Sequence, residues 1–187
     1  MAKFKNKYRI ESTRLKNWDY SRQAAYFITI CTANREHFFG KTENEEIILS
    51  LIGSIVEQEW IKTPDIRPDM NLELGEFVVM PNHFHGIIFI GNNEFNSDRD
   101  AMCRDAMHGV STNGIYKNEF GPQSKNLSSI LRGFKSAVTI QARKINPEFG
   151  WQSRFHDQII RNTKSFDAIS QYIIDNPKKW VDDEFNK

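Results

Sequence analysis

The fold of this chain is decided by residues 77–90, which read FVVMPNHFHGIIFI. Their apolar and β-branched composition predicts two strands joined by a tight break at Pro81-Asn82. Because side chains on a strand alternate between its faces, we expect His83 and His85 to point the same way and Phe84 the opposite way. The apolar run at 86–90 is typical of a strand buried on both faces.

The two histidines form a candidate metal site. Imidazoles two positions apart on a strand lie roughly 7 Å apart along one face, so they can converge on one divalent ion if a third ligand comes from elsewhere. The alternative is that His83 and His85 merely occupy an exposed strand end. A His-x-His pattern by itself leaves both interpretations open.

Strands elsewhere in the chain are predicted from β-branched content and alternation. These further strands are residues 25–32, 71–79 and 151–161. A first helix is expected between strands, because apolar residues recur at helical spacing up to Trp60 or Ile61. Thr42 and Glu45 have the spacing of a capping box, which would start this helix at residue 42.

Two more helices are predicted in the second half of the chain. Residues 127–145 carry an apolar stripe, and Ser124 or Asn126 can cap it. The last helix is expected to begin at Ser165 and to end near Asn176-Pro177. The order β-α-β-β-α-β-α predicts an α+β, ferredoxin-like sandwich, in which helices pack on one face of a four-stranded antiparallel sheet.

The 187 residues suit a single domain. We expect a basic N-terminal arm at 1–22 and one domain at 23–187, interrupted by an inserted flexible loop at about 92–124 that is rich in Asn, Asp, Gly and Ser. No apolar run reaches the ~20 residues needed to span a bilayer, and no apolar segment of a signal peptide follows the basic start. The two cysteines imply no disulfide framework. The sequence therefore predicts a cytoplasmic protein with no membrane association.

The net charge of +1 conceals a segregation of charge along the chain. Basic residues outnumber acidic ones at 1–22 and 125–164, whereas acidic residues predominate at 41–76. Two basic segments in a neutral chain suit a localised track for a polyanion, although solvated helix faces would look the same. Basic and aromatic side chains of these segments are candidate DNA-binding residues: Arg14, Lys16, Trp18, Lys125, Arg132, Lys135, Arg143 and Lys144.

Tyr172 is the candidate partner of the histidine pair. On the predicted last helix, Asn176 lies one turn after Tyr172 on the same face, with Asp175 beside it. Tyr172 could project its phenol over a metal ion while Asn176 or Asp175 supplies a side-chain oxygen. The phenol has a pKa near 10, so a nearby cation or base would have to favour the phenolate. Alternatively, Tyr172 is a half-buried side chain with its hydroxyl in water.

Four motifs taken together resemble the single-tyrosine HUH transposases, and more narrowly the REP-associated tyrosine transposases. They are VMPNHFH at 79–85, LRGFKS at 131–136, WQSRF at 151–155 and YIIDNP at 172–177. The N-terminal Trp18-Asp19-Tyr20 followed by YFITI at 26–30 also fits this subfamily. The resemblance covers most of the chain apart from 92–124. The insertion at 92–124 and His156, where relatives often carry an aromatic residue, depart from the pattern.

This resemblance implies a ferredoxin-like fold and a site in which His83 and His85 bind Mg²⁺ or Mn²⁺. It implies that Tyr172 is the nucleophile and that a polar residue matching Asn176 completes the coordination. The implied activity is nicking and rejoining of single-stranded, hairpin-forming repetitive DNA through a 5′-phosphotyrosine. It also implies a nucleoid-associated protein, either a monomer or a homodimer, whose tyrosine serves its own or a neighbour's histidines.

Two other functions remain open at this stage. The chain could be a non-catalytic nucleic-acid-binding module or a domesticated repressor with the same fold. The central strands, however, carry aliphatic residues and histidines rather than the stacking aromatics of RNA-recognition sheets. It could also be a metal-dependent hydrolase without a covalent step, which is disfavoured because no helical His-Glu-x-x-His or carboxylate-rich ligand set is present.

Overall fold

The computed structural model describes residues 3–4, 7–8, 15, 18–97, 124–183, 185 and 186. Its centre is a four-stranded antiparallel sheet of β3 (Ala24–Cys31), β6 (Leu72–Met80), β7 (His83–Ile90) and β8 (His156–Ile160). The strand order is β6-β7-β3-β8. The histidine strand β7 is therefore hydrogen-bonded on both sides, with Thr29 opposite His85 and Cys31 opposite His83. The predicted α+β class and antiparallel sheet are confirmed.

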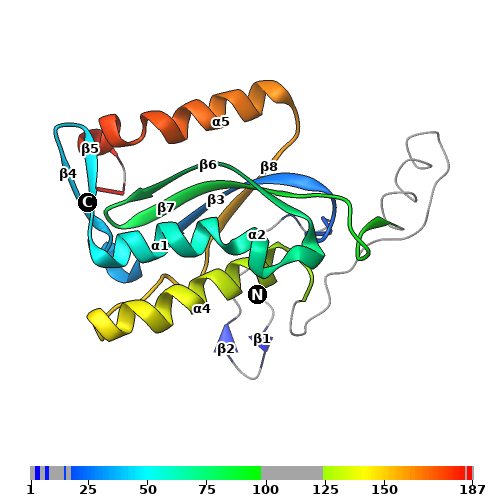
Figure 1. The fold of residues 1–187 in the computed structure, drawn as a ribbon, viewed down its shortest axis with the longest axis horizontal. Coiled ribbons are helices and arrows are strands. Elements are labelled where there is room, and N and C mark those ends of the chain that lie inside the picture. Colours follow the sequence, from blue (N-terminus) through cyan, green and yellow to red (C-terminus); the bar gives the residue numbers. More distant parts are fainter. Residues whose placement is uncertain are drawn as a thin grey trace.

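Three helices cover this sheet, and they do not all lie on one face (Figure 1). On one side lie α1 (Leu51–Ile61) and α4 (Leu127–Ile145), which pack against each other. On the other side lies α5 (Thr163–Asp175), which packs against β6 and β7. The prediction that the helices share one face is wrong for α5, because strand alternation gives the second face an apolar surface of its own that needs cover.

The two faces of the sheet accordingly have separate hydrophobic cores. The larger core joins alternate residues of the central strands, such as Ile28 and Phe84, to Trp60 of α1 and Phe134 of α4. The smaller core joins the intervening strand residues to α5. Its fully or nearly buried members are Phe27, Ile87, Ile160 and Ile173. The histidines of β7 lie on this second face, beneath α5.

The prediction that the first helix starts at Thr42 is wrong. Residues 40–49 instead form a hairpin of β4 (Gly40–Glu43) and β5 (Glu46–Leu49). Its two-residue turn, Asn44 and Glu45, has positive φ at both positions, as hairpin turns of this length require. Helix α1 begins after Ser50, whose side chain accepts a hydrogen bond from the Gly53 N–H. Its predicted end at Ile61 is confirmed.

The remaining predicted boundaries are partly confirmed. Asn126 caps α4 in a capping box, as one of the two candidates predicted, and α5 ends at Asp175. The cap of α5 is Asn162 rather than Ser165, because its side chain accepts a hydrogen bond from the Ser165 N–H. The predicted strand 151–161 is shorter, since only His156–Ile160 pairs with β3 while Trp151 makes an isolated bridge to Thr32.

Short elements complete the described chain. They are β1 (Lys3–Phe4), β2 (Lys7–Tyr8), the α-helical turn α2 (Thr63–Ile66) and the 3₁₀ turns η1 (Ala33–Arg35), η2 (Pro68–Met70) and η3 (Pro177–Asp182). The predicted arm and insertion fall largely outside the described residues, which resume at 18 and at 124. Within the described ranges, none of the helices combines the length and the apolar character that crossing a bilayer requires.

Candidate active site

The histidine pair opens the central strand β7, and its orientation follows the predicted alternation. Phe84 points into the larger core, where its ring lies 4.8 Å from that of Trp60. His83 and His85 point to the opposite face, with their ring centroids 4.5 Å apart. Both are almost fully buried, at 0% and 2% exposed. They are therefore not on an exposed strand end, which removes that alternative.

His85 has a polar partner on each ring nitrogen. Its Nδ1 lies 2.8 Å from Oγ1 of Thr29, the residue directly opposite it on β3. Its Nε2 lies 3.3 Å from the hydroxyl oxygen of Tyr172. The helix α5 thus brings the predicted tyrosine to the predicted histidine, and it does so within one chain.

Tyr172 is held at this position by aromatic packing. Its ring meets Phe27 edge-on at 6.1 Å and His85 at 5.3 Å between centroids. The residue is nevertheless 39% exposed, so this packed tyrosine is also accessible in part from solvent. A phenol in this setting can reach an external substrate without a rearrangement of the core.

His83 is enclosed differently. Its Nδ1 lies 2.9 Å from Oδ1 of Asn82, whereas its Nε2 is buried and has no hydrogen-bond partner among the described residues. The rings of Phe185 and Trp180 cover it, at centroid distances of 4.6 and 5.9 Å. An unpaired buried ring nitrogen is unfavourable unless something binds it, so this atom is a candidate ligand atom.

Burial keeps both imidazoles neutral. The pKa of His83 is lowered to about 2, first by burial and then by His85 and Arg35. The pKa of His85 is lowered to about 3, first by burial and then by His156. A neutral imidazole carries a free lone pair on one nitrogen, which is the form that binds a metal ion.

Asn176 supplies a second unpaired buried atom. It is 1% exposed, and its Oδ1 has no partner among the described residues. It lies four positions after Tyr172, which contacts His85, and four before Trp180, which contacts His83. The spacing of four from Tyr172 puts Asn176 on the same side of α5 as that tyrosine.

The residues present fit a divalent cation of nitrogen and oxygen preference. His83 Nε2 and Asn176 Oδ1 are both buried and have no hydrogen-bond partner among the described residues. In the described ranges, no group of three His, Cys, Asp or Glu side chains is placed to hold a metal ion. The amide oxygen of Asn176 remains the predicted third protein ligand.

A pocket of about 430 Å³ opens beside His85 and Tyr172. Much of its wall comes from Gln152, Arg154 and Phe155 before β8 and from His156 at the start of β8, and the ring of Phe185 lines it near the histidines. Sequence reasoning did not place these five side chains at the site. The WQSRF motif at 151–155 was a signal for the first three, but nothing local to Phe185 indicates what its ring covers.

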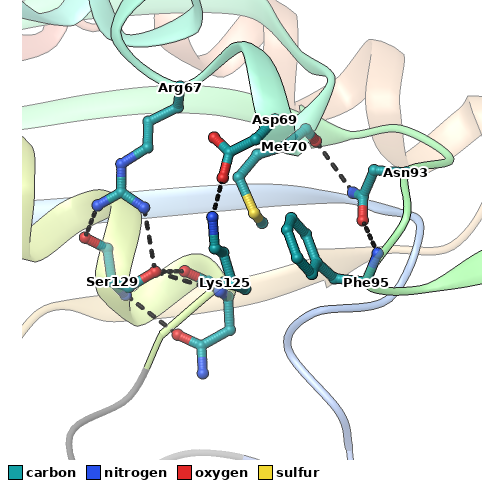
Figure 2. Close-up of polar contacts among 8 residues, drawn as sticks. Arg67, Asp69, Met70, Asn93, Phe95, Lys125 and Ser129 are labelled. Carbon is teal, nitrogen blue, oxygen red and sulfur yellow. Dashed lines mark hydrogen bonds and ion pairs between the residues drawn. The ribbon is translucent and has the colours of Figure 1, made fainter.

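The predicted basic face of α4 lies across the sheet from Tyr172, because α4 and α5 cover opposite faces (Figure 1). Several of its cations have intramolecular partners. Figure 2 shows Lys125 paired with Asp69, and the ammonium lies 4.4 Å from the ring centroid of Phe95. Arg143 Nε donates to the Phe149 carbonyl at 3.0 Å.

Lys135 also turns inward. Its Nζ donates to the carbonyl of Gln152 at 2.7 Å, and burial lowers its pKa to about 8. It thereby supports the segment that lines the pocket. Arg132 and Lys144 are exposed on α4, and Trp18 is half-buried, with its Nε1 donating to the Tyr26 hydroxyl at 3.2 Å. Arg14 and Lys16 lie outside the described residues.

This chain has a sequence relative and a structural neighbour among known proteins. No family model matches the sequence. An uncharacterized protein of Haemophilus influenzae is 37% identical over 174 residues, which cover 92% of this chain and 91% of that protein. The chain belongs to the family of this Haemophilus protein.

Among solved structures, a REP-associated tyrosine transposase bound to a REP hairpin superimposes with a TM-score of 0.56. The alignment covers 92% of this chain and 74% of that chain, at 21% sequence identity. At this identity the likeness shows a shared fold.

Proposed function

We propose that this protein cuts and rejoins single-stranded DNA by transesterification, with Tyr172 as the nucleophile. The observation that carries the proposal is the position of Tyr172: its hydroxyl lies 3.3 Å from His85 Nε2, the residue is 39% exposed, and the buried Nε2 of His83 on the same face has no partner among the described residues. Perturbed, buried titratable groups beside a pocket are a frequent feature of catalytic sites.

The residues that would hold Mg²⁺ or Mn²⁺ are His83 and His85 through their Nε2 atoms and Asn176 through Oδ1. When bound there, the cation would polarise a phosphate oxygen and offset the negative charge that develops during the reaction. Nε2 of His85 has a single lone pair, so it can serve either the cation or the Tyr172 hydroxyl.

Tyr172 would attack the phosphorus of one phosphodiester. A bond forms between the phenolic oxygen and phosphorus as the bond from phosphorus to the 3′ oxygen breaks. The phenolic proton leaves to solvent, and the departing 3′ oxygen takes up a proton to become a hydroxyl. A strand joined to Tyr172 through its 5′ phosphate results, and attack by a 3′ hydroxyl on this phosphotyrosine reverses the chemistry and restores a phosphodiester.

The pocket suits the strand that would carry the scissile phosphate. Arg154 and His156 bring positive charge or hydrogen-bond donors to its wall, and Phe27, Phe155 and Phe185 bring aromatic surface. Cationic side chains that contact the phosphates, together with aromatic side chains on which the bases stack, are the usual means of holding an unpaired strand. Hairpin-forming DNA is the proposed substrate class, supported by the shared fold with a transposase whose structure contains a REP hairpin.

The test is formation of a covalent adduct. The protein is incubated with Mn²⁺ and hairpin oligonucleotides that carry single-stranded flanks and a label at the 3′ end, because the piece retained on tyrosine is downstream of the cut. We expect a labelled protein band on a denaturing gel. Tyr172→Phe, which keeps the ring packing and removes only the hydroxyl, should abolish it.

Gln171→Ala is the matched control, since Gln171 is exposed on the same helix and its amide contacts only Asp175 among the contacts described. It should leave the adduct intact. Binding of the hairpin without any adduct, unchanged by EDTA, would instead identify a non-catalytic DNA-binding protein. A Mn²⁺-dependent cleavage product without protein-linked DNA would indicate hydrolysis.

A further inference from the structure

Asn82 sits in the turn between β6 and β7, and its side-chain amide is oriented without ambiguity. The residue is 1% exposed. Its Nδ2 donates to two backbone carbonyls, that of Arg35 at 3.1 Å and that of Phe185 at 2.7 Å. Carbonyl oxygens only accept hydrogen bonds, so the amide nitrogen must face them and the amide oxygen must face the other way.

The amide oxygen of Asn82 faces His83. The distance from Oδ1 to Nδ1 of the imidazole is 2.9 Å. Because Oδ1 is an acceptor only, Nδ1 must carry the proton of this hydrogen bond. A neutral imidazole has one N–H, so Nε2 of His83 is left with its lone pair, and this is the buried atom that has no partner among the described residues.

We propose that Asn82 is a positioning residue that locks His83 in the Nδ1–H tautomer and presents the Nε2 lone pair to the site. The tautomer follows from the hydrogen bonds alone, whereas the use of that lone pair to bind a divalent cation rests on the proposed function. Partners that hold the second nitrogen of a metal-binding histidine fix its tautomer and ring orientation in this way.

Asn82 restricts the tautomer of His83, whereas the hydroxyl partners of His85 do not restrict the tautomer of His85. The Thr29 hydroxyl on Nδ1 of His85 can donate or accept, and so can the Tyr172 hydroxyl on its Nε2. Both tautomers of His85 are therefore compatible with its surroundings. The chain fixes one imidazole of the pair and leaves the other able to exchange its proton between two hydroxyl partners.

The test is a direct observation of the tautomer in the metal-free protein. Long-range ¹H–¹⁵N NMR spectra of histidine-labelled protein separate a protonated from an unprotonated ring nitrogen, at a pH above the ordinary histidine pKa of about 6.5. We expect His83 to show a protonated Nδ1 and an unprotonated Nε2. A protonated Nε2 on His83 in the wild-type protein would overturn the proposal.

Two variants separate the role of the amide oxygen from that of the amide nitrogen. Asn82→Asp and Asn82→Leu both lose the donors to Arg35 and Phe185, but only the carboxylate keeps an acceptor for His83 Nδ1. We expect Asn82→Asp to retain the wild-type tautomer and Asn82→Leu to populate the Nε2–H form. An unchanged His83 spectrum in a folded Asn82→Leu protein would contradict a positioning role. If Asn82→Leu does not fold, loss of the Nδ1–H tautomer of His83 in Asn82→Asp would contradict that role instead.

Mn²⁺ titration of the same proteins gives a second readout. Asn82→Leu should weaken Mn²⁺ affinity by about 10- to 100-fold, as removal of such partners does in characterised metal sites, while Asn82→Asp should retain or exceed the wild-type affinity. If the tautomer behaves as expected but the wild-type protein binds no Mn²⁺, the orientation by Asn82 is supported and the proposed metal chemistry is overturned.

Discussion

The buried histidine pair should make this protein unusually sensitive to acid. Burial first, and neighbouring positive charge second, lowers the pKa of His83 to about 2 and that of His85 to about 3. In the unfolded chain both imidazoles regain an ordinary pKa of about 6.5. At any pH between these values the unfolded chain binds more protons than the folded one. The free energy of unfolding therefore falls as the pH drops below about 6.5.

The size of the effect follows from these shifts. Each pH unit below about 6.5 removes about 1.4 kcal/mol of stability for each buried imidazole. At about pH 5 the loss is ~2 kcal/mol for His83 and ~2 kcal/mol for His85, or ~4 kcal/mol together. Domains are stable by only about 5–15 kcal/mol, so this is a large fraction of the total. The loss levels off only as the pH falls through about 3 and 2, where the folded rings protonate.

Urea unfolding between about pH 7 and pH 5, in EDTA to exclude bound metal, measures this slope. His83→Gln removes one of the two buried imidazoles and should reduce the pH-dependent loss by about half, whatever its effect on stability at neutral pH. His37→Gln is the control, because His37 is an exposed residue at the surface, where its ring contacts Trp180. A wild-type loss of less than about 1 kcal/mol over this range, or a full slope in His83→Gln, would refute the reasoning.

Three further substitutions test the packing of the sheet, of α4 and of the site. Gly86→Ala would place a Cβ 2.8 Å from the buried ring of Phe84, so it should destabilise the fold by about 1–3 kcal/mol in thermal unfolding. Gly133→Ala lies in α4, where the nearest atom to the new Cβ is 3.4 Å away, so it should stabilise the fold by about 0.5–1 kcal/mol. Equal effects of the two substitutions would contradict the packing argument. Phe185→Ala removes the ring that lies 4.6 Å from that of His83, so carbethoxylation of His83 by diethyl pyrocarbonate should become faster, and an unchanged rate would show that Phe185 does not limit access.

Local sequence patterns were sufficient for the sheet and for the direction of the histidines. Strand alternation is a property of the backbone itself, so His83 and His85 share one face and Phe84 takes the other whatever packs above them. The apolar stripe of 127–145 likewise predicted α4 from end to end. These features depend on residues close together in the chain, which is why the sequence reveals them.

The hairpin at 40–49 shows where local patterns fail. Ile48 lies at helical spacing from Leu51 and Ile52 but is equally suited to a strand, and the turn uses Asn44-Glu45 instead of the Asn-Gly pair that usually marks a hairpin. Pairing of β4 with β5 is what favours a strand over a helix here. The hydrogen bonds between the two strands cannot be predicted from the sequence of either strand alone.

The sequence by itself predicted the candidate site residues and the face of its own element on which each would lie. Tertiary structure alone decided that α5 covers the second face of the sheet, that Tyr172 meets His85 there, and that Asn82 and Phe185 enclose His83. The physical reason is that these contacts join residues as much as about a hundred positions apart, through apolar burial and hydrogen bonds that form only when separate elements pack together.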